Sequence, residues 1–372
     1  MKSEHKPVNY VTRPALPSLQ ELNRYLEEIW DNRILTNNGP FHRQFESALA
    51  EFLGVKYVSL FANGTLALMT ALKALRISGE VITTPYSFVA TSHSLLWNNI
   101  KPVFADVDSK YCNIDPEKIE AAITPGTTAI LPVHVYGNPC QVEVIQEIAG
   151  RHGLKVIYDA CHTFGVRMNG MPVLNFGDLS VLSFHATKVF TTFEGGAVIC
   201  HDRQMKQYID YLKNFGFAGE TSVLEVGINA KMNEFQAALG LLQLEHIGEY
   251  ISRRRRITEF YRNYLRQIPG LRYMDDMPGV EHCYSYFPVF IEETGFGMSR
   301  DELYKKLKKN DIFARRYFYP LISQFPQYQN LDSARPDNLP EAENLTRQVL
   351  CLPLYPDLTD EELIKIVQLI RG

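Results

Sequence analysis

Hydrophobic residues follow two different spacings along this chain. Before residue 55 they recur every three or four positions, which predicts two amphipathic helices, at 18–30 and 41–53. Ser18 and Glu21 have the spacing of a capping box at the start of the first helix. From residue 57 onward the apolar residues form short runs of strand length, at 57–61, 81–83, 102–106, 129–133, 156–159, 179–184 and 197–200.

These seven apolar runs predict a single sheet. Helical patterns separate most of them, at 65–75, 87–98, 116–123 and 142–152. Strands with little polar alternation that are separated by helices are typical of a mostly parallel sheet covered on both faces, so we predict the α/β class. Gly195 and Gly196 follow Lys188 too closely for a crossover helix, which predicts that the last strand runs antiparallel.

A long helical pattern at 234–267 follows the predicted sheet. The remaining residues mix both kinds of element: we predict strands at 286–291 and 312–315, and helices at 300–308, 340–350 and 360–370. We therefore divide the chain into a large domain over residues 1–244, which includes the N-terminal helices, and a smaller C-terminal α/β domain over residues 245–372.

Composition and charge argue against several classes of function. The chain has 372 residues, 45% of them hydrophobic, and a net charge of −4, so we expect no nucleic-acid or membrane partner. We interpret the arginine run 253–256 as the solvated face of a helix. Six scattered cysteines without metal-site spacing indicate reduced, mostly buried thiols and no metal. Residues 1–7 lack an apolar signal and no apolar run could span a membrane, so we predict a cytoplasmic protein.

Lys188 lies between two predicted buried strands, within the stretch 181–200. A lysine held between buried strands is costly unless something uses its charge, and lysine is the side chain that condenses with carbonyl groups. The hydroxyls of Ser183 and Thr187 nearby are suited to binding an anion. A single lysine of this kind is nevertheless more often a loop-tip residue in water, so partners elsewhere in the chain decide its role.

The ends of other predicted strands supply such partners, because ligands of parallel sheets bind beyond the carboxyl ends of the strands. Asn63, Gly64 and Thr65 open a helix whose free N–H groups attract anions, although any helix cap looks similar. Phe88 follows the second strand and either packs in the core or faces this edge. Asp159 ends the fifth strand, either as a helix cap or as the partner of a positive charge.

Together these residues match the needs of pyridoxal 5'-phosphate. This cofactor requires a lysine for its aldehyde, a carboxylate for its pyridinium nitrogen, an aromatic face for its ring and a cup for its phosphate. Lys188 is the lysine, Asp159 the carboxylate and Phe88 the aromatic face. Ser183 and the turn at 63–65 form the phosphate cup. The functional prediction depends on the whole set, with Lys188 and Asp159 as the candidate catalytic residues.

In these residues and their neighbours the chain resembles the sugar aminotransferases of the DegT/DnrJ/StrS group, which are fold-type I pyridoxal-phosphate enzymes. The resemblance spans most of residues 34–240, and beyond them it is looser, through RYFYP at 316–320 and LPL at 352–354. The motifs that carry it are NGT at 63–65, PYSFVAT at 85–91, FADVD at 104–108, PVH at 132–134, YDA at 158–160, SFHATK at 183–188, EGG at 194–196 and GINAKM at 227–232.

The resemblance implies a role for each matched position. Lys188 bonds the cofactor and moves a proton, Asp159 holds the pyridinium nitrogen, and Phe88 stacks on the ring. His162 stands where many relatives carry glutamine beside the ring hydroxyl, and the substitution keeps a polar group at that place. Four residues of the same chain bind the phosphate: Asn63, Gly64, Thr65 and Ser183. The neighbouring subunit adds a fifth, the partner's Asn229. The residues expected to meet the sugar are Thr36, Asn38, Gly39, His185 and Tyr317.

The resemblance also implies the substrates. The runs at 33–40 and 79–93 are most similar to the branch that converts dTDP-4-keto-6-deoxy-D-glucose to dTDP-4-amino-4,6-dideoxy-D-glucose, with L-glutamate as amino donor. The product would enter O-antigen or a similar lipopolysaccharide glycan. Because each site takes a residue from both subunits, the resemblance implies an obligatory homodimer.

Three alternatives stay open or are disfavoured. Amination at C3 of a related dTDP-linked sugar stays open, as do the configuration of the amine and the nucleotide. Lys188 argues against the related dehydratases, in which histidine replaces the lysine. A regulatory protein with this fold is a distant alternative, because the chain is acidic and shows no helix-turn-helix.

Overall fold

The computed structural model describes residues 8–372, so the polar segment 1–7 lies outside the described residues. Its largest sheet has seven strands in the order β2-β10-β9-β6-β5-β3-β4. β10 runs antiparallel to both of its neighbours, as predicted, and the other pairs are parallel. The strands are β2 (Tyr57–Phe61), β3 (Glu80–Thr83), β4 (Lys101–Phe104), β5 (Thr127–Leu131), β6 (Lys155–Asp159), β9 (Leu179–Ser183) and β10 (Gly196–Cys200).

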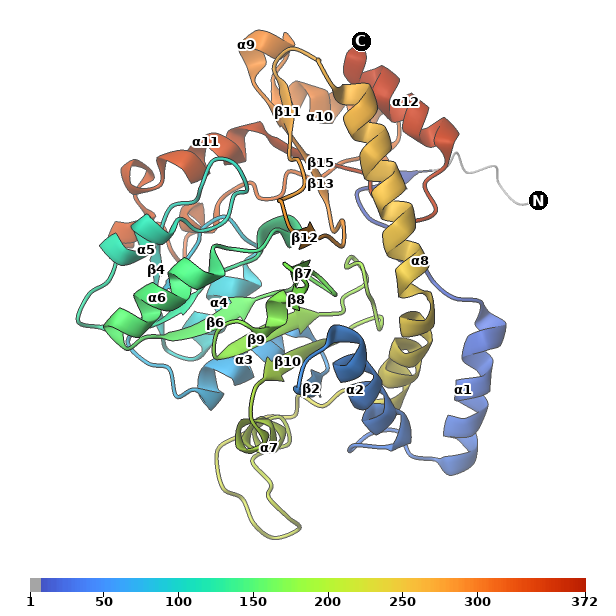
Figure 1. The fold of residues 1–372 in the computed structure, drawn as a ribbon, viewed down its shortest axis with the longest axis vertical. Helices are drawn as coiled ribbons and strands as arrows, with labels where there is room; N and C mark the ends of the chain where they lie inside the picture. Colours follow the sequence, from blue (N-terminus) through green and yellow to red (C-terminus); the bar gives the residue numbers. More distant parts are fainter. Residues whose placement is uncertain (1–7) are drawn as a thin grey trace.

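Helices cover both faces of this sheet (Figure 1). They are α2 (Pro40–Leu53), α3 (Gly64–Ala74), α4 (Ala90–Trp97), α5 (Pro116–Ala121), α6 (Val142–His152) and α7 (Arg203–Leu212). Successive strand residues point to opposite faces. Tyr158 and Leu182 therefore join the core under α2 and α6, whereas Ile157 and Val181 join the core under α3 and α7. The prediction of a mostly parallel, doubly covered sheet is confirmed.

A helix of 32 residues, α8 (Glu234–Leu265), leads from the sheet into the C-terminal part of the chain. Its first half packs in the core of the large sheet, and its second half packs in a separate core through Ile257 and Tyr261. α1 (Leu19–Asn32) lies beside it and begins with the predicted capping box of Ser18 and Glu21 (Figure 1). The domain boundary at residue 245 stays a prediction.

A smaller antiparallel sheet follows α8, made of β11 (Leu271–Tyr273), β13 (Phe287–Ile291) and β15 (Val349–Leu352). The prediction of a helix over 340–350 is wrong at its end: α11 (Pro340–Gln348) stops there, because the buried residues 349–352 pair with β13. The predicted strand 312–315 is shorter: β14 (Ile312–Phe313) pairs with β1 (Asn9–Tyr10), and Arg315 forms an isolated antiparallel bridge with Cys351.

Other helices and another small sheet belong to the rest of the fold. α10 (Arg300–Lys309) and α12 (Asp360–Arg371) occupy the predicted positions, and α9 (Glu293–Phe296) is a single turn. A further small sheet consists of β12 (Val280–Glu281), β7 (Arg167–Met168) and β8 (Met171–Pro172).

The arginine run on α8 is not one solvated face. Consecutive helical residues point in different directions, and Arg254 is only 2% exposed. Its Nη1 donates to the carbonyl oxygens of Tyr284 and Leu354, over 3.3 and 2.9 Å, and burial lowers the pKa of its guanidinium to about 10. The other three arginines are exposed and pair with carboxylates, so the solvated interpretation is wrong for Arg254 alone.

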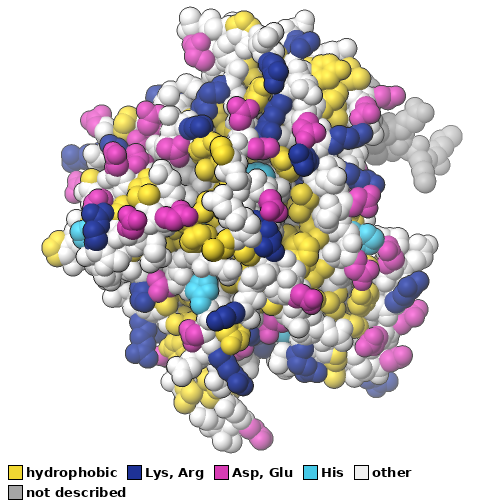
Figure 2. Space-filling view, in the orientation of Figure 1, with side chains coloured by type: hydrophobic (Ala, Val, Ile, Leu, Met, Phe, Trp, Pro, Cys, Tyr) yellow, Lys and Arg dark blue, Asp and Glu magenta, His cyan; other side chains and the backbone are white. Residues whose placement is uncertain are grey.

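Three sequence-based expectations concern the distribution of surface charge, the state of the cysteines and the apolarity of the helices. On the face drawn in Figure 2, basic and acidic side chains are interspersed, without an extended region of one sign. All six cysteines are free thiols, and all except the half-buried Cys161 are buried. Within residues 8–372 no helix has the length and apolarity that crossing a membrane requires.

Candidate active site

A cavity of about 310 Å³ opens beyond the carboxyl ends of the parallel strands, beside the ends of β6 and β9. It brings together most of the residues singled out from the sequence. Its lining includes Asn63, Gly64, Thr65, Phe88, Asp159, His162, Ser183, His185, Lys188 and Tyr317.

Lys188 reaches this cavity from the loop between β9 and β10. Its backbone N–H donates to the carbonyl of His185 over 2.9 Å, which makes a turn at this point. Phe190, in the same loop, stacks on Phe164 with ring centroids 4.2 Å apart and is fully buried. The loop is therefore anchored in the core, and Lys188 is half-buried in the cavity wall rather than a loop-tip lysine in water.

Asp159 ends β6 and is 5% exposed. Its Oδ2 accepts a hydrogen bond from Thr91 Oγ1 over 2.7 Å, and its Oδ1 accepts one from the N–H of Cys161 over 3.2 Å. Residues 160–165 form turns, so the helix-cap alternative is wrong. Both of these donors are uncharged, and a buried charge of this kind favours a positive partner such as a pyridinium.

The turn between β2 and α3 lies against the central strands. Asn63 caps α3, because its Oδ1 accepts the N–H of Leu66 over 2.9 Å. A Cβ atom on Gly64 would come within 2.9 Å of Ser183 Cβ, and one on Gly196 within 2.7 Å of the Asn63 carbonyl carbon. The two glycines thus allow the turn at 63–64 to contact both the end of β9 and the start of β10. The first turn of α3 has no acidic side chain, so its free N–H groups and the Ser183 hydroxyl suit a phosphate.

His162 is 5% exposed at the same edge. Its Nδ1 accepts the backbone N–H of Tyr136 over 3.2 Å, so in the neutral ring the proton lies on Nε2. Burial, with Lys188 nearby, holds the pKa of this imidazole well below its usual value. The ring lies nearly parallel to that of Phe318, at 5°, and meets the edge of Tyr286. His162 therefore presents a neutral N–H donor.

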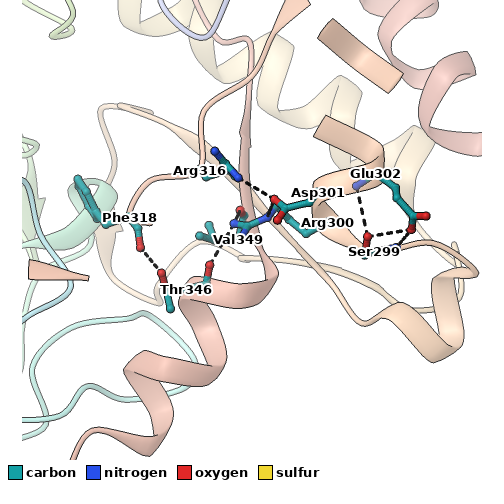
Figure 3. A network of polar contacts seen from close by, with 8 residues as sticks. All are labelled: Ser299, Arg300, Asp301, Glu302, Arg316, Phe318, Thr346 and Val349. Carbon is teal, nitrogen blue, oxygen red and sulfur yellow. Dashed lines mark hydrogen bonds and ion pairs between the residues drawn. The ribbon is translucent and has the colours of Figure 1, made fainter. Parts of the chain in front are cut away.

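The C-terminal part of the chain closes the cavity with residues that the sequence did not single out: Tyr286, Arg315 and Phe318. Figure 3 shows the polar contacts around the loop 315–320, which carries Arg315 and Phe318. Arg300, which is 4% exposed, donates through Nη1 to the carbonyls of Thr346 and Val349, over 3.0 and 2.9 Å.

Two hydrogen bonds tie the loop 315–320 to α10 and α11. The Oδ1 of Asp301 accepts from both Arg300, over 2.7 Å, and Arg316, over 2.9 Å. The Thr346 hydroxyl donates to the carbonyl of Phe318 (Figure 3). The RYFYP motif at 316–320 was the only sequence signal for this loop.

Four predicted residues do not line the cavity of their own chain. Asn229 Oδ1 accepts from Lys231 Nζ over 2.8 Å, and the residue that caps α8 is Asn233, so Asn229 is not the helix cap. The other three lie before α2: Thr36 and Asn38 are exposed, and Gly39 is buried at the start of the helix.

Glu234 explains one of these residues by structure alone. Its side chain is fully buried, and its two carboxylate oxygens accept the N–H groups of Phe41 and His42, over 2.8 and 2.9 Å. A Cβ atom on Gly39 would come within 2.5 Å of the Glu234 carboxyl carbon. Glycine at 39 therefore makes room for the carboxylate that caps α2.

The profile of the DegT/DnrJ/EryC1/StrS aminotransferase family matches residues 18–371. The chain belongs to this family. Among curated relatives, the dTDP-4-amino-4,6-dideoxy-D-glucose transaminase of Escherichia coli is 54% identical over 97% of this chain and 98% of its own. The enzyme of the same name from Shigella dysenteriae is 53% identical, over 98% and 99% of the two chains. The sequence-based family assignment is confirmed.

Solved structures agree in fold. DesI, determined with its TDP-sugar product, superposes with a TM-score of 0.94 at 35% identity, over 99% of this chain and 93% of its own. PseC of Helicobacter pylori, an aminotransferase of pseudaminic acid biosynthesis, gives 0.91 at 30% identity, over 98% of both chains. The predicted fold class is thereby confirmed.

Proposed function

We propose that this aminotransferase converts dTDP-4-keto-6-deoxy-D-glucose to dTDP-4-amino-4,6-dideoxy-D-glucose, with pyridoxal 5'-phosphate as cofactor and L-glutamate as amino donor. The observation that carries the proposal is the identity of 54% over nearly the whole chain to a transaminase of that name. The convergence of Lys188, Asp159 and Phe88 on one cavity supports the cofactor. The product suits a bacterial surface glycan such as O-antigen, and the free thiols suit the cytoplasm.

The residues around the cavity fit the cofactor. Asp159 is a buried carboxylate that needs a positive partner, which the pyridinium nitrogen supplies. The start of α3 and Ser183 hold the phosphate, and Phe88, which is 58% exposed in this chain, offers its face to the ring. Once bound, the cofactor supplies an acceptor for the electron pair that a breaking C–H bond leaves behind.

The protein contributes positioning and proton transfer. Lys188 is the nucleophile for the cofactor's aldehyde, and its amine, once free, carries the proton between the substrate carbon and the cofactor. His162 would donate its Nε2–H to the oxygen on the cofactor ring, because its Nδ1 already accepts from Tyr136. Tyr286, Tyr317 and Phe318 cover the cavity and exclude water from the reacting atoms.

We also propose that the enzyme is a homodimer whose sites are shared. The segment after α7 projects from the lower edge of the molecule in Figure 1 and carries exposed apolar side chains, including Leu224 and Val226, 62% and 79% exposed. Trp97, 74% exposed, lines a groove together with Val226 and Ile228. Such apolar exposure suits a surface covered by a second copy. This arrangement would bring Asn229 and the turn at 36–39 to the partner's cavity.

Product analysis tests the proposed reaction. The purified holoenzyme is incubated with dTDP-4-keto-6-deoxy-D-glucose and L-glutamate, and the product is identified by NMR. We expect an amino group at C4 and one 2-oxoglutarate per amino sugar. An enzyme that aminates only the 3-keto isomer, or that accepts no amine from glutamate, would contradict the proposal.

A further inference from the structure

A chain of buried hydroxyl groups leads to the carboxylate of Asp159. Ser87 Oγ lies 2.8 Å from Thr91 Oγ1, which lies 2.7 Å from Asp159 Oδ2. All three side chains are buried, with exposed fractions of 5%, 1% and 5%. Each of these residues also borders the cavity, so the hydroxyl chain forms part of its wall.

The chemistry of the groups fixes the direction of these hydrogen bonds. An ionised carboxylate only accepts, so the Thr91 hydroxyl proton points to Asp159. The Thr91 oxygen is then the acceptor for the Ser87 hydroxyl. Asp159 receives a second bond from the N–H of Cys161 on its other oxygen. One donor on each oxygen fixes the plane of the carboxylate and leaves further lone pairs for a ligand.

Ser87 and Phe88 lie in the loop between β3 and α4, and Thr91 lies in the first turn of α4. Phe88 lines the cavity, so one continuous stretch, 87–91, presents the aromatic face and braces the carboxylate. The N–H of Thr91 donates to the carbonyl of Phe88 over 3.2 Å, and this turn brings Thr91 back to Ser87.

We propose that Thr91 is a positioning residue: its hydroxyl orients and stabilises the charged Asp159 carboxylate for the pyridinium nitrogen, and Ser87 orients Thr91 in turn. The inference rests on the proposed function, because it assumes pyridoxal phosphate in this cavity. A hydrogen bond to a charged group is worth about tenfold or more in an equilibrium constant. Its loss is expected to weaken the cofactor's binding and to slow proton transfer.

The test begins with Thr91→Val, which keeps the shape and removes the hydroxyl. Apo-protein is titrated with pyridoxal 5'-phosphate, and the visible absorption of the bound cofactor gives its dissociation constant. We expect Thr91→Val to raise this constant about tenfold, Thr91→Ser to restore it to within about twofold, and Ser87→Ala to fall between. In single turnovers with glutamate, the maximal rate should fall in the same order while the half-saturating glutamate concentration stays unchanged.

Thr70→Val is the matched control, because the Thr70 hydroxyl is also buried but has no hydrogen-bond partner among the described residues. It should bind the cofactor as the wild type does. In addition, Thr91→Val should have little effect on the background of Asp159→Asn, because the two residues act as one unit.

Two results would overturn the inference: wild-type cofactor binding in Thr91→Val, or an equally large effect of Thr91→Val when residue 159 is asparagine. Both are distinct from a failure of the proposed function, in which the wild-type chain itself would gain no visible absorption from the cofactor.

Discussion

The cavity wall around Asp159 and the segment around Asn229 differ in how far a single chain completes them. Asp159 is held by two hydrogen bonds, one from Thr91 on α4 and one from the N–H of Cys161 just after it, and is 5% exposed. The segment at 223–228 instead exposes large apolar side chains. The polar atoms beside it pair locally, with Lys231 Nζ 2.8 Å from both Asn229 Oδ1 and Asn214 Oδ1. One region is finished by its own chain, and the other has the character of an interface.

The largest effect is expected at the completed region, from Lys188→Ala. Without its amine the protein has neither the nucleophile for the cofactor nor the group that moves the proton. We expect turnover of glutamate and the keto sugar to fall below detection, while the protein stays folded. Lys155→Ala is the control, since that lysine is exposed at the opposite end of β6. Normal turnover in Lys188→Ala would refute its role.

Asp159→Asn tests the same region with a change of charge alone. The amide keeps the shape but no longer balances a pyridinium charge. We expect the maximal rate to fall about 100-fold or more and the cofactor to bind more weakly. Rate and cofactor affinity are measured beside the exposed Asp332→Asn, which should resemble the wild type. Wild-type values in Asp159→Asn would place the pyridinium partner elsewhere.

Mixing two variants tests whether Asn229 acts in the cavity of the partner subunit. Asn229→Asp places a negative charge against the phosphate and should reduce activity about tenfold or more. A mixed dimer with Lys188→Ala should have one site with both defects and one with neither. Activity should therefore reappear after subunit exchange, which mass spectrometry follows. Confirmed exchange without any recovery would mean that Asn229 acts in its own chain or not at all.

Glu234→Gln tests the contact between the start of α8 and the segment 35–42, which includes the start of α2. The carboxylate caps α2, and the N–H of Glu234 donates to the carbonyl of Leu35 over 2.9 Å. The amide can accept only one of the two α2 bonds, so the free energy of unfolding should fall by about 1–3 kcal/mol. Chemical denaturation measures this against the exposed Glu249→Gln, for which about 0.5 kcal/mol or less is expected. Equal stabilities would show that the cap contributes nothing.

The smallest effect concerns acid. Burial lowers the pKa of His134 to about 3 and that of His282 to about 4, from an ordinary value of 6.5. Between these values the unfolded chain binds more protons than the folded one, so stability is full above pH 6.5 and decreases as the pH falls. The melting temperature should decline from about pH 6.5 downward, and less steeply in His134→Gln. An equal slope in that variant would assign the acid sensitivity to other groups.

The sequence predicted the central sheet because its strands are apolar runs that need no distant information. It misassigned the start of β15, because 349–350 become strand only through pairing with β13, about 60 residues earlier in the chain. Lys188 and Asp159 were predictable because strand ends converge at one edge. Tyr286 was not, because it reaches the cavity from the segment before β13, whose placement depends on tertiary packing. Phe318 lies in the RYFYP motif, from which only its neighbour Tyr317 was expected at the site.

The anchoring of the cavity cover has a consequence for protein engineering. Tyr317 and Phe318 border the space where the acceptor substrate is proposed to bind, so this loop is a natural target for grafting from relatives with other sugars. Its shape, however, is set from outside, by Asp301 on α10 and Thr346 on α11, which bond Arg316 and Phe318 (Figure 3), and by Arg300 on α10, whose guanidinium lies over the Tyr319 ring. A graft of 315–320 alone would lose these ties unless the donor loop meets the same three residues. A successful graft would therefore transfer the loop together with Arg300, Asp301 and Thr346.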